Sequence, residues 1–280
     1  TSLRWFDLSQ NRLLSLPKEM ENLGKLQMLV LENNSLRQLP PQVEHLTSLQ
    51  SLNLAHNNLT TLPPEFGALV LLEDLYLHSN LLLTLPDSFG SLMALRRLDM
   101  RGNKLKALPE EFSELYCLTE LNACANNLKF LPEQMGELCK LENLNLAKNH
   151  ITALPDSVSM LGALKKLRLD ENDLRVLGDY VSGWTALVDL DVGHNDIKFI
   201  SPQVGELCAL KKMCLRSNRV SSLPPEVGLV TELESFDLAY NELTALPVEL
   251  GALSFLSALN LSHNHISGRV PDQLGLLLWL

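Results

Sequence analysis

The chain has few aromatic residues, few basic ones and no long hydrophobic run. Aromatic side chains make up 5% of its 280 residues, which argues against broad stacking platforms for nucleic-acid bases. Lys and Arg total 23 against 33 Asp and Glu, a net charge of −10. This balance disfavours nucleic acid or an anionic membrane as the main partner, because both need a basic surface. The apolar run Leu274–Leu280 is far shorter than the roughly 20 residues that span a bilayer.

Cysteine is also scarce, and the number of cysteines is odd. The five are Cys117, Cys124, Cys139, Cys208 and Cys214, with no cluster at either end of the chain. This spacing does not resemble a disulfide framework. Scattered thiols indicate a reducing compartment, so the sequence predicts a cytoplasmic protein.

Motifs of common catalytic sites are missing as well. The chain contains no GxxxxGK[ST], HExxH or GxSxG sequence. The segment Asp189–Asn195 begins like a calcium loop, but His194 replaces the glycine at the sixth position and Ile200 replaces the glutamate at the twelfth. The sequence therefore predicts no catalytic residue and no cofactor.

Two pairs of histidines are candidate metal ligands. His56 and His78 can approach each other across neighbouring repeats, and His263 and His265 lie within one. Neither pair has an obvious third ligand in the sequence, so surface histidines are the favoured interpretation and no metal site is predicted.

What the chain does have is a 23-residue repeat that runs without a slip from Leu3 to Leu256. Apolar residues recur at repeat positions 1, 4, 6, 11, 14, 18 and 21. A strict period of this length predicts a solenoid, in which each repeat is stable only when stacked on its neighbours. Position 9 is always asparagine: Asn11, Asn34, Asn57, Asn80, Asn103, Asn126, Asn149, Asn172, Asn195, Asn218, Asn241 and Asn264.

Each half of the repeat predicts one structural element. Positions 3 to 7 alternate variable and apolar residues, as in Arg97–Arg101, which is typical of a strand with one buried face. The asparagine that follows can satisfy backbone groups of its own and the neighbouring repeat, so these twelve residues are predicted to be structural. Leu-Pro at positions 14 and 15 predicts the start of a short helical or 3-10 segment. Narrow strands and wider helical turns predict a horseshoe with a concave parallel sheet.

These positions resemble the leucine-rich repeat consensus LxxLxLxxNxLxxLPxxLGxLxx over essentially the whole chain. The LPxxLGxL half is similar to intracellular proteins of the Ras-pathway scaffold type, including the Scribble and Erbin relatives and the plant Ras-group proteins. The resemblance implies a concave surface that binds other proteins, among them small GTPases, phosphatase subunits and cytoskeletal or polarity factors.

Three repeats depart from this pattern. Gly178 stands where proline is expected and Trp184 where leucine is usual, and in the next repeat Ser201 stands in the proline position. A bend, a convex partner site or a harmless packing change would each account for these differences. The last repeat, Ile266–Gly275, is similar to the SGxxP form of plant receptor ectodomains. It keeps an extracellular receptor as the alternative function.

The concave face is predicted to carry the partner site. The candidate residues at its variable strand positions fall into an apolar, a basic and an alternating-charge group: Trp5, Met28, Tyr76 and His78; Arg97, Asp99 and Arg101; and Lys166, Arg168, Asp189, Asp191, Lys212 and Arg216.

Each group has a structural alternative. Trp5 and Met28 could instead be covered by chain that precedes Thr1. Opposite charges on adjacent strands support one another by roughly 0.2–1 kcal/mol a pair, so the third group could be a self-satisfied salt-bridge ladder. As a partner site it would orient a charged protein.

The prediction is therefore a single leucine-rich repeat domain over residues 1–280, a non-catalytic scaffold for a protein partner in Ras-type signalling. A recognition module of an enzyme whose catalytic domain lies elsewhere is a further alternative. Because the chain starts at Thr1 and Leu280 opens a thirteenth repeat, we expect a segment of a longer protein that is uncapped at both ends.

Overall fold

The structure is a computed structural model that describes residues 2–276. Thr1 and Leu280, on which the expectation of uncapped ends depends, lie outside the described residues. The chain divides into a first half, residues 1–141, and a second half, residues 142–280. A single domain over the whole chain stays a prediction.

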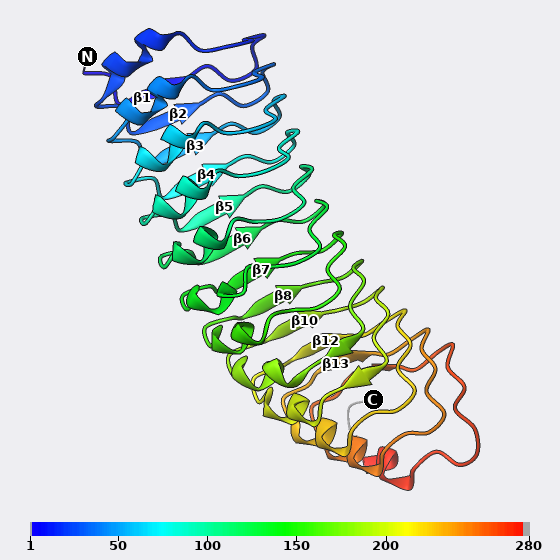
Figure 1. The fold of residues 1–280 in the computed structure, drawn as a ribbon. Helices are drawn as coiled ribbons and strands as arrows, with labels where there is room; N and C mark the ends of the chain where they lie inside the picture. Colours follow the sequence, from blue (N-terminus) through cyan, green and yellow to red (C-terminus); the bar gives the residue numbers. More distant parts are fainter. Residues whose placement is uncertain (1, 277–280) are drawn as a thin grey trace. The chain divides into compact units, whose positions relative to one another are not determined.

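The first half contains six parallel strands, one per repeat, in the order of the sequence (Figure 1). Its strands are β1 (Trp5–Asp7), β2 (Met28–Val30), β3 (Ser51–Asn53), β4 (Asp74–Tyr76), β5 (Arg97–Asp99) and β6 (Glu120–Asn122). Between them lie the 3-10 turns η1 (Lys18–Leu23), η2 (Pro41–His45), η3 (Pro64–Ala68), η4 (Asp87–Ser91), η5 (Glu110–Glu114) and η6 (Met135–Glu137).

The second half repeats this plan and adds a second, smaller sheet. Its main strands are β7 (Asn143–Asn145), β8 (Lys166–Arg168), β10 (Asp189–Asp191), β12 (Lys212–Cys214), β13 (Ser235–Asp237) and β14 (Ala258–Asn260). Its turns are η7 (Asp156–Met160), η8 (Asp179–Gly183), η9 (Pro202–Glu206), η10 (Pro225–Leu229), η11 (Val248–Ala252) and η12 (Asp272–Leu276). The smaller sheet pairs β9 (Val176–Leu177) with β11 (Phe199–Ile200).

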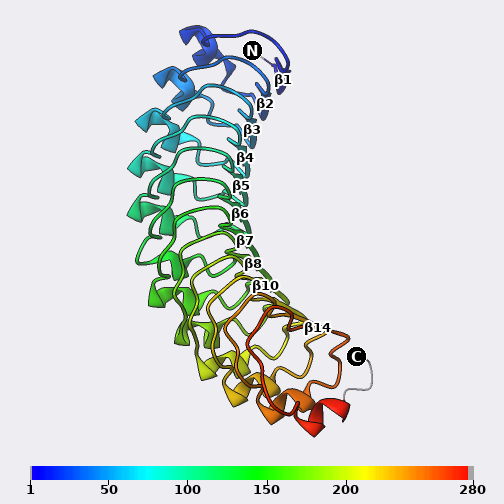
Figure 2. The same ribbon diagram turned by 90° about the vertical axis from the view of Figure 1, so that its right-hand side faces the viewer.

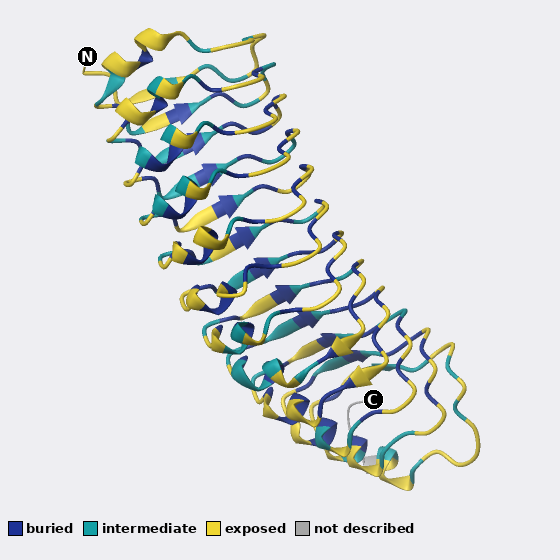
Figure 3. Ribbon diagram, viewed as in Figure 1, coloured by how far each residue is buried: buried dark blue, intermediate teal, exposed yellow. Residues whose placement is uncertain are grey.

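The strands line one face of each half and the 3-10 turns line the opposite face (Figure 2). The core between them is made of the leucines at the consensus positions. In the three-residue strands from β2 to β13 the central residue is buried and its neighbours are not, as the period of two predicts (Figure 3). The turns add a stack of phenylalanines: the ring of Phe89 lies parallel to those of Phe66 and Phe112, with centroids 6.2 and 6.0 Å away. One parallel strand and one 3-10 turn per repeat confirm the predicted fold class.

The asparagines join each repeat to the one before it. The side chain of Asn80 accepts a hydrogen bond from the Leu59 N–H at 3.0 Å and donates to the Leu54 carbonyl at 2.9 Å, both in the preceding repeat. It also donates to the Leu77 carbonyl of its own strand at 3.0 Å. Asn80 is 4% exposed, so a leucine in its place would leave buried backbone groups unpaired.

The residue before each asparagine has a left-handed backbone. Position 8 has φ between +52° and +64° in all twelve repeats, although only Gly102 is a glycine. Side chains at this position, His56 among them, therefore leave the chain in a direction that an extended strand would not give.

The departures near Gly178 are explained by packing and backbone pairing. Ser201 keeps a backbone N–H that proline would lack, and it donates to the Leu177 carbonyl at 2.8 Å, beside the β9–β11 pair. Trp184 is fully buried and its indole N–H donates to the Val158 carbonyl at 2.8 Å. Of the alternatives raised by the sequence, this supports a packing change over a partner site at Trp184.

Candidate functional site

Side chains at the variable strand positions form an open surface on each half, here called the strand face. In the first half, Trp5 and Met28 are adjacent partners in the β1–β2 register and are 63% and 41% exposed. They border an open depression together with Arg4, Gln27, Ser51 and Asp74. Two large apolar side chains side by side in solvent are typical of a binding surface.

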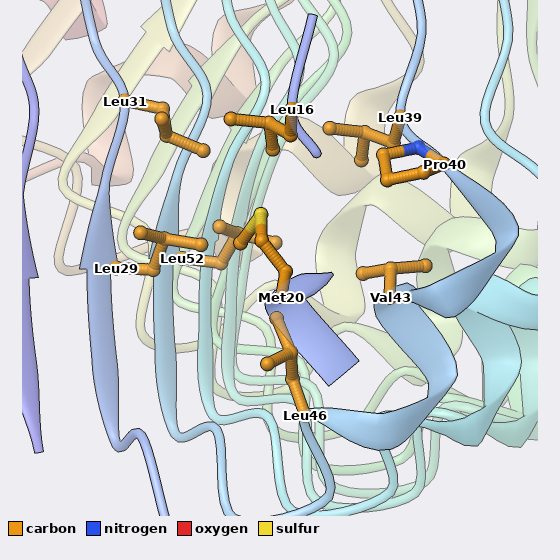
Figure 4. Close-up of a pocket in the computed structure, with 9 residues that line it drawn as sticks. All are labelled: Leu16, Met20, Leu29, Leu31, Leu39, Pro40, Val43, Leu46 and Leu52. Atoms are coloured by element: carbon orange, nitrogen blue, oxygen red, sulfur yellow. The ribbon is translucent and has the colours of Figure 1, made fainter. Parts of the chain in front are cut away.

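A second, small pocket of the first half belongs to the core. Figure 4 shows Met20 reaching into it, and its lining is entirely apolar. The lining residues are Leu16, Met20, Leu29, Leu31, Leu39, Pro40, Val43, Leu46 and Leu52. Because ligand sites combine an apolar lining with a few placed polar groups, this pocket is better explained as a packing gap.

The charged residues of the first half are largely paired. Arg97 donates to the Asp74 carboxylate at 2.6 Å, and this hydrogen bond raises the pKa of the guanidinium. Asp99 lies 3.6 Å from both Arg101 and His78. The structure thus brings the predicted residues Asp99, Arg101 and His78 together. Arg97 is held separately by Asp74, which is not among the residues predicted from the sequence.

In the second half one arginine holds two carboxylates. Arg168 contacts Asp191 at 2.6 Å and Asp189 at 3.0 Å. Arg216 lies 3.9 Å from Asp237, and its guanidinium stands 4.7 Å from the centre of the Tyr240 ring. These contacts follow the self-satisfied ladder that the sequence offered as the alternative.

Lys166 and Lys212 are different. Both are exposed, and each is the register partner of Asp189 on one side of β10. Asp189 itself is taken by Arg168, and within residues 2–276 neither lysine forms an ion pair. They are the positive charges of this strand face that remain available to a partner.

Cys214 lies on the same face but is unsuited to nucleophilic chemistry. Burial raises the pKa of its thiol to about 12, so at neutral pH it is almost entirely protonated. None of the five cysteines forms a disulfide.

One cluster bears on the prediction that no third ligand lies near the pair His56 and His78. His56 and His78 meet edge to face with ring centroids 5.1 Å apart. A ligand atom of Glu32 lies within 4.8 Å of one from each histidine. The prediction that this pair has no third ligand nearby is therefore wrong. Glu32 was missed because it is two repeats from His78 in the sequence, at the same repeat position.

The comparisons with known proteins agree with this geometry. The profile of the Leucine rich repeat family matches residues 1–59, 26–82, 47–105, 72–128 and 208–266. The chain belongs to the leucine-rich repeat family. No curated protein sequence matches it.

Solved structures of other leucine-rich repeat proteins are similar over nearly the whole chain. A leucine-rich repeat protein of Leptospira interrogans is 35% identical with a TM-score of 0.89, over 98% of this chain and 70% of that one. The PEPR1–AtPEP1 structure is 29% identical with a TM-score of 0.87, over 99% and 41%. The ectodomain of the Arabidopsis thaliana receptor kinase GASSHO1/SCHENGEN3, in complex with CASPARIAN STRIP INTEGRITY FACTOR 2, is 27% identical with a TM-score of 0.66, over 98% and 43%.

The chain thus spans less than half the length of the matched chain in each of the last two structures. Among residues 2–276 there is no helix with the length and apolar character of a membrane span. The narrower resemblance to Ras-pathway scaffolds and the cytoplasmic location both stay predictions.

Proposed function

We propose that this leucine-rich repeat protein is a non-catalytic interaction module that binds a protein or peptide partner on its strand face. The observation that carries the proposal is the exposed pair Trp5 and Met28, which lie next to each other in register on β1 and β2. Exposed aromatic and methionine side chains are frequent anchors in protein interfaces.

The strand face of the second half, taken by itself, offers charge to an acidic partner. Lys166 and Lys212 flank a carboxylate already held by Arg168, so a partner meets two positive charges without breaking an existing ion pair. Such charges set the orientation and association rate of an acidic partner more than its final affinity. Small GTPases and phosphatase subunits, the partners implied by the sequence resemblance, are the intracellular candidates.

A receptor-type ectodomain is the second candidate. Two similar solved structures contain AtPEP1 and CASPARIAN STRIP INTEGRITY FACTOR 2 as partners of plant proteins, and the segment Ile266–Pro271 has the SGxxP form. A peptide ligand would then take the place of the globular partner on the same face.

The test compares proteins captured by four forms of the chain from extracts of its native cells. The strand-face variant is Trp5→Ser with Met28→Ser. Its control carries Met93→Ser with Phe130→Ser, a methionine and an aromatic that are 61% and 63% exposed away from the strands. The charge variant Lys166→Glu with Lys212→Glu is the fourth form.

We expect the wild type and the control to capture the same partner, and the strand-face variant to lose it. The charge variant should bind more slowly and with less dependence on salt. Loss of the partner in the control, with retention in the strand-face variant, would move the site to another surface.

A further inference from the structure

We propose that Glu32, His56 and His78 bind a zinc-type dication on the strand face of the first half. Two imidazoles and a carboxylate each present a ligand atom, and these three atoms lie within 4.8 Å of one another. Ligand atoms in a tetrahedral zinc site are about 3.3 Å apart, as bond lengths of about 2.0–2.1 Å require. Side-chain rotations that bring the ligand atoms up to about 1.5 Å closer together would close the site.

The repeat pattern explains why residues from three repeats meet. Glu32 and His78 occupy position 7 of the second and fourth repeats, with Ala55 at position 7 of the repeat between them. Alanine leaves the space between the two longer side chains open, and it is itself fully buried beneath them. His56 follows Ala55, and its positive φ of 53° turns its ring toward His78.

The carboxylate is positioned before any metal arrives. One oxygen of Glu32 accepts a hydrogen bond from the Asn53 amide at 2.9 Å, and the other accepts from Asn33 at 3.3 Å. Asn53 is in turn fixed by the Ala55 N–H, which donates to its side-chain oxygen at 3.0 Å. A ligand that is held in this way loses little side-chain entropy on binding.

One ring nitrogen of His78 lies beside a carboxylate. Its Nδ1 is shielded from solvent and has no hydrogen-bond partner within residues 2–276. Asp99 Oδ2 lies 3.6 Å from that nitrogen. When a histidine binds metal through one nitrogen, the other nitrogen usually donates to a carboxylate, and Asp99 is in the place where that contact would form.

The ligand chemistry favours zinc over harder cations. Two neutral imidazoles and one carboxylate suit Zn²⁺, whereas Mg²⁺ and Ca²⁺ require a shell of oxygens. Three protein ligands leave a fourth position for water.

The test is titration calorimetry of the untagged chain with Zn²⁺, with Mg²⁺ as the comparison cation. Three variants remove one ligand each. Glu32→Gln keeps the shape of the side chain. His56→Asn and His78→Ala each introduce the residue that another repeat has at the same position, namely Asn33 and Ala55. His150→Ala is the matched control, because His150 is an exposed histidine 3.4 Å from a single carboxylate, that of Asp173.

We expect one Zn²⁺ per chain, no competition by Mg²⁺, and an affinity that falls by more than about tenfold in each of the three variants. The control should match the wild type. With Co²⁺ as a spectroscopic substitute, the site should show no thiolate charge-transfer band, which separates it from binding by the free cysteines. Absence of binding, equal affinity in the three variants, or a thiolate band would overturn the proposal. None of these outcomes depends on the protein partner.

Discussion

Replacement of Asn80 by alanine tests the link between neighbouring repeats most sharply. The substitution removes three short hydrogen bonds, to the N–H of Leu59 and to the carbonyls of Leu54 and Leu77. It also removes a fourth, at 3.4 Å to the His78 carbonyl, which is too long to add much. The Leu59 N–H is left without a partner inside the protein. A buried donor in that state costs about 1–3 kcal/mol.

The two carbonyls lose less, because each is shared between two asparagines. Asn57 also donates to the Leu54 carbonyl at 3.1 Å, and Asn103 donates to the Leu77 carbonyl at 3.0 Å. Each therefore loses one of two hydrogen bonds, at about 0.5–1.5 kcal/mol. The sum for Asn80→Ala is about 2–6 kcal/mol of unfolding free energy.

Asn11→Ala is the control at the same repeat position. Asn11 is exposed, and within residues 2–276 it bonds only to the Leu8 and Ser9 carbonyls of its own repeat. Its loss should therefore cost less than about 1 kcal/mol. Urea denaturation followed by circular dichroism gives both free energies. A difference below about 0.5 kcal/mol between the two variants would refute the role assigned to the buried asparagines.

Three further predictions concern single residues. Gly90→Ala should destabilise the first half by about 1–3 kcal/mol, because the Cβ of the new alanine would lie 2.2 Å from the Glu111 carbonyl oxygen. In the control Gly162→Ala the new Cβ would have no atom closer than 3.8 Å, so thermal stability should change little. Equal losses of thermal stability in the two variants would contradict this prediction. Ala125→Gly should raise the unfolding free energy measured by urea denaturation by up to about 1 kcal/mol, because a φ of 54° strains alanine and suits glycine. A lower unfolding free energy in this variant would show that the turn is not strained. Burial raises the pKa of the Cys214 thiol to about 12, so only about one Cys214 thiol in ten thousand is ionised at pH 8. Cys214 should therefore react with Ellman's reagent at pH 8 far more slowly than the exposed Cys208. Similar reaction rates at the two cysteines, measured by mass spectrometry, would contradict the burial of the Cys214 thiol.

Much of the fold could be predicted from the sequence because the repeat imposes the same local choices twelve times. The period of two at Arg97–Arg101 and the proline before each turn determine one strand and one 3-10 segment per repeat. The β9–β11 pair was not predicted, because it depends on the single backbone N–H that Ser201 gains where proline is absent.

The candidate sites were harder to predict, because they depend on side chains from different repeats. A comparison of equivalent positions in successive repeats identifies His56 and His78 as neighbours. It does not identify Glu32, which approaches them across the small side chain of Ala55. Likewise, the charge pattern alone did not separate Arg168, held by two carboxylates, from residues that remain free to bind a partner.

The central claim is that partners bind on the strand face, and the most direct test is the dissociation constant of one captured partner for two double variants. We expect a complex at least about tenfold weaker for Trp5→Ser with Met28→Ser, because two anchor side chains are lost. The dissociation constant should be unchanged for Met93→Ser with Phe130→Ser. Unchanged affinity in the first variant, or an equal loss in both, would contradict this claim.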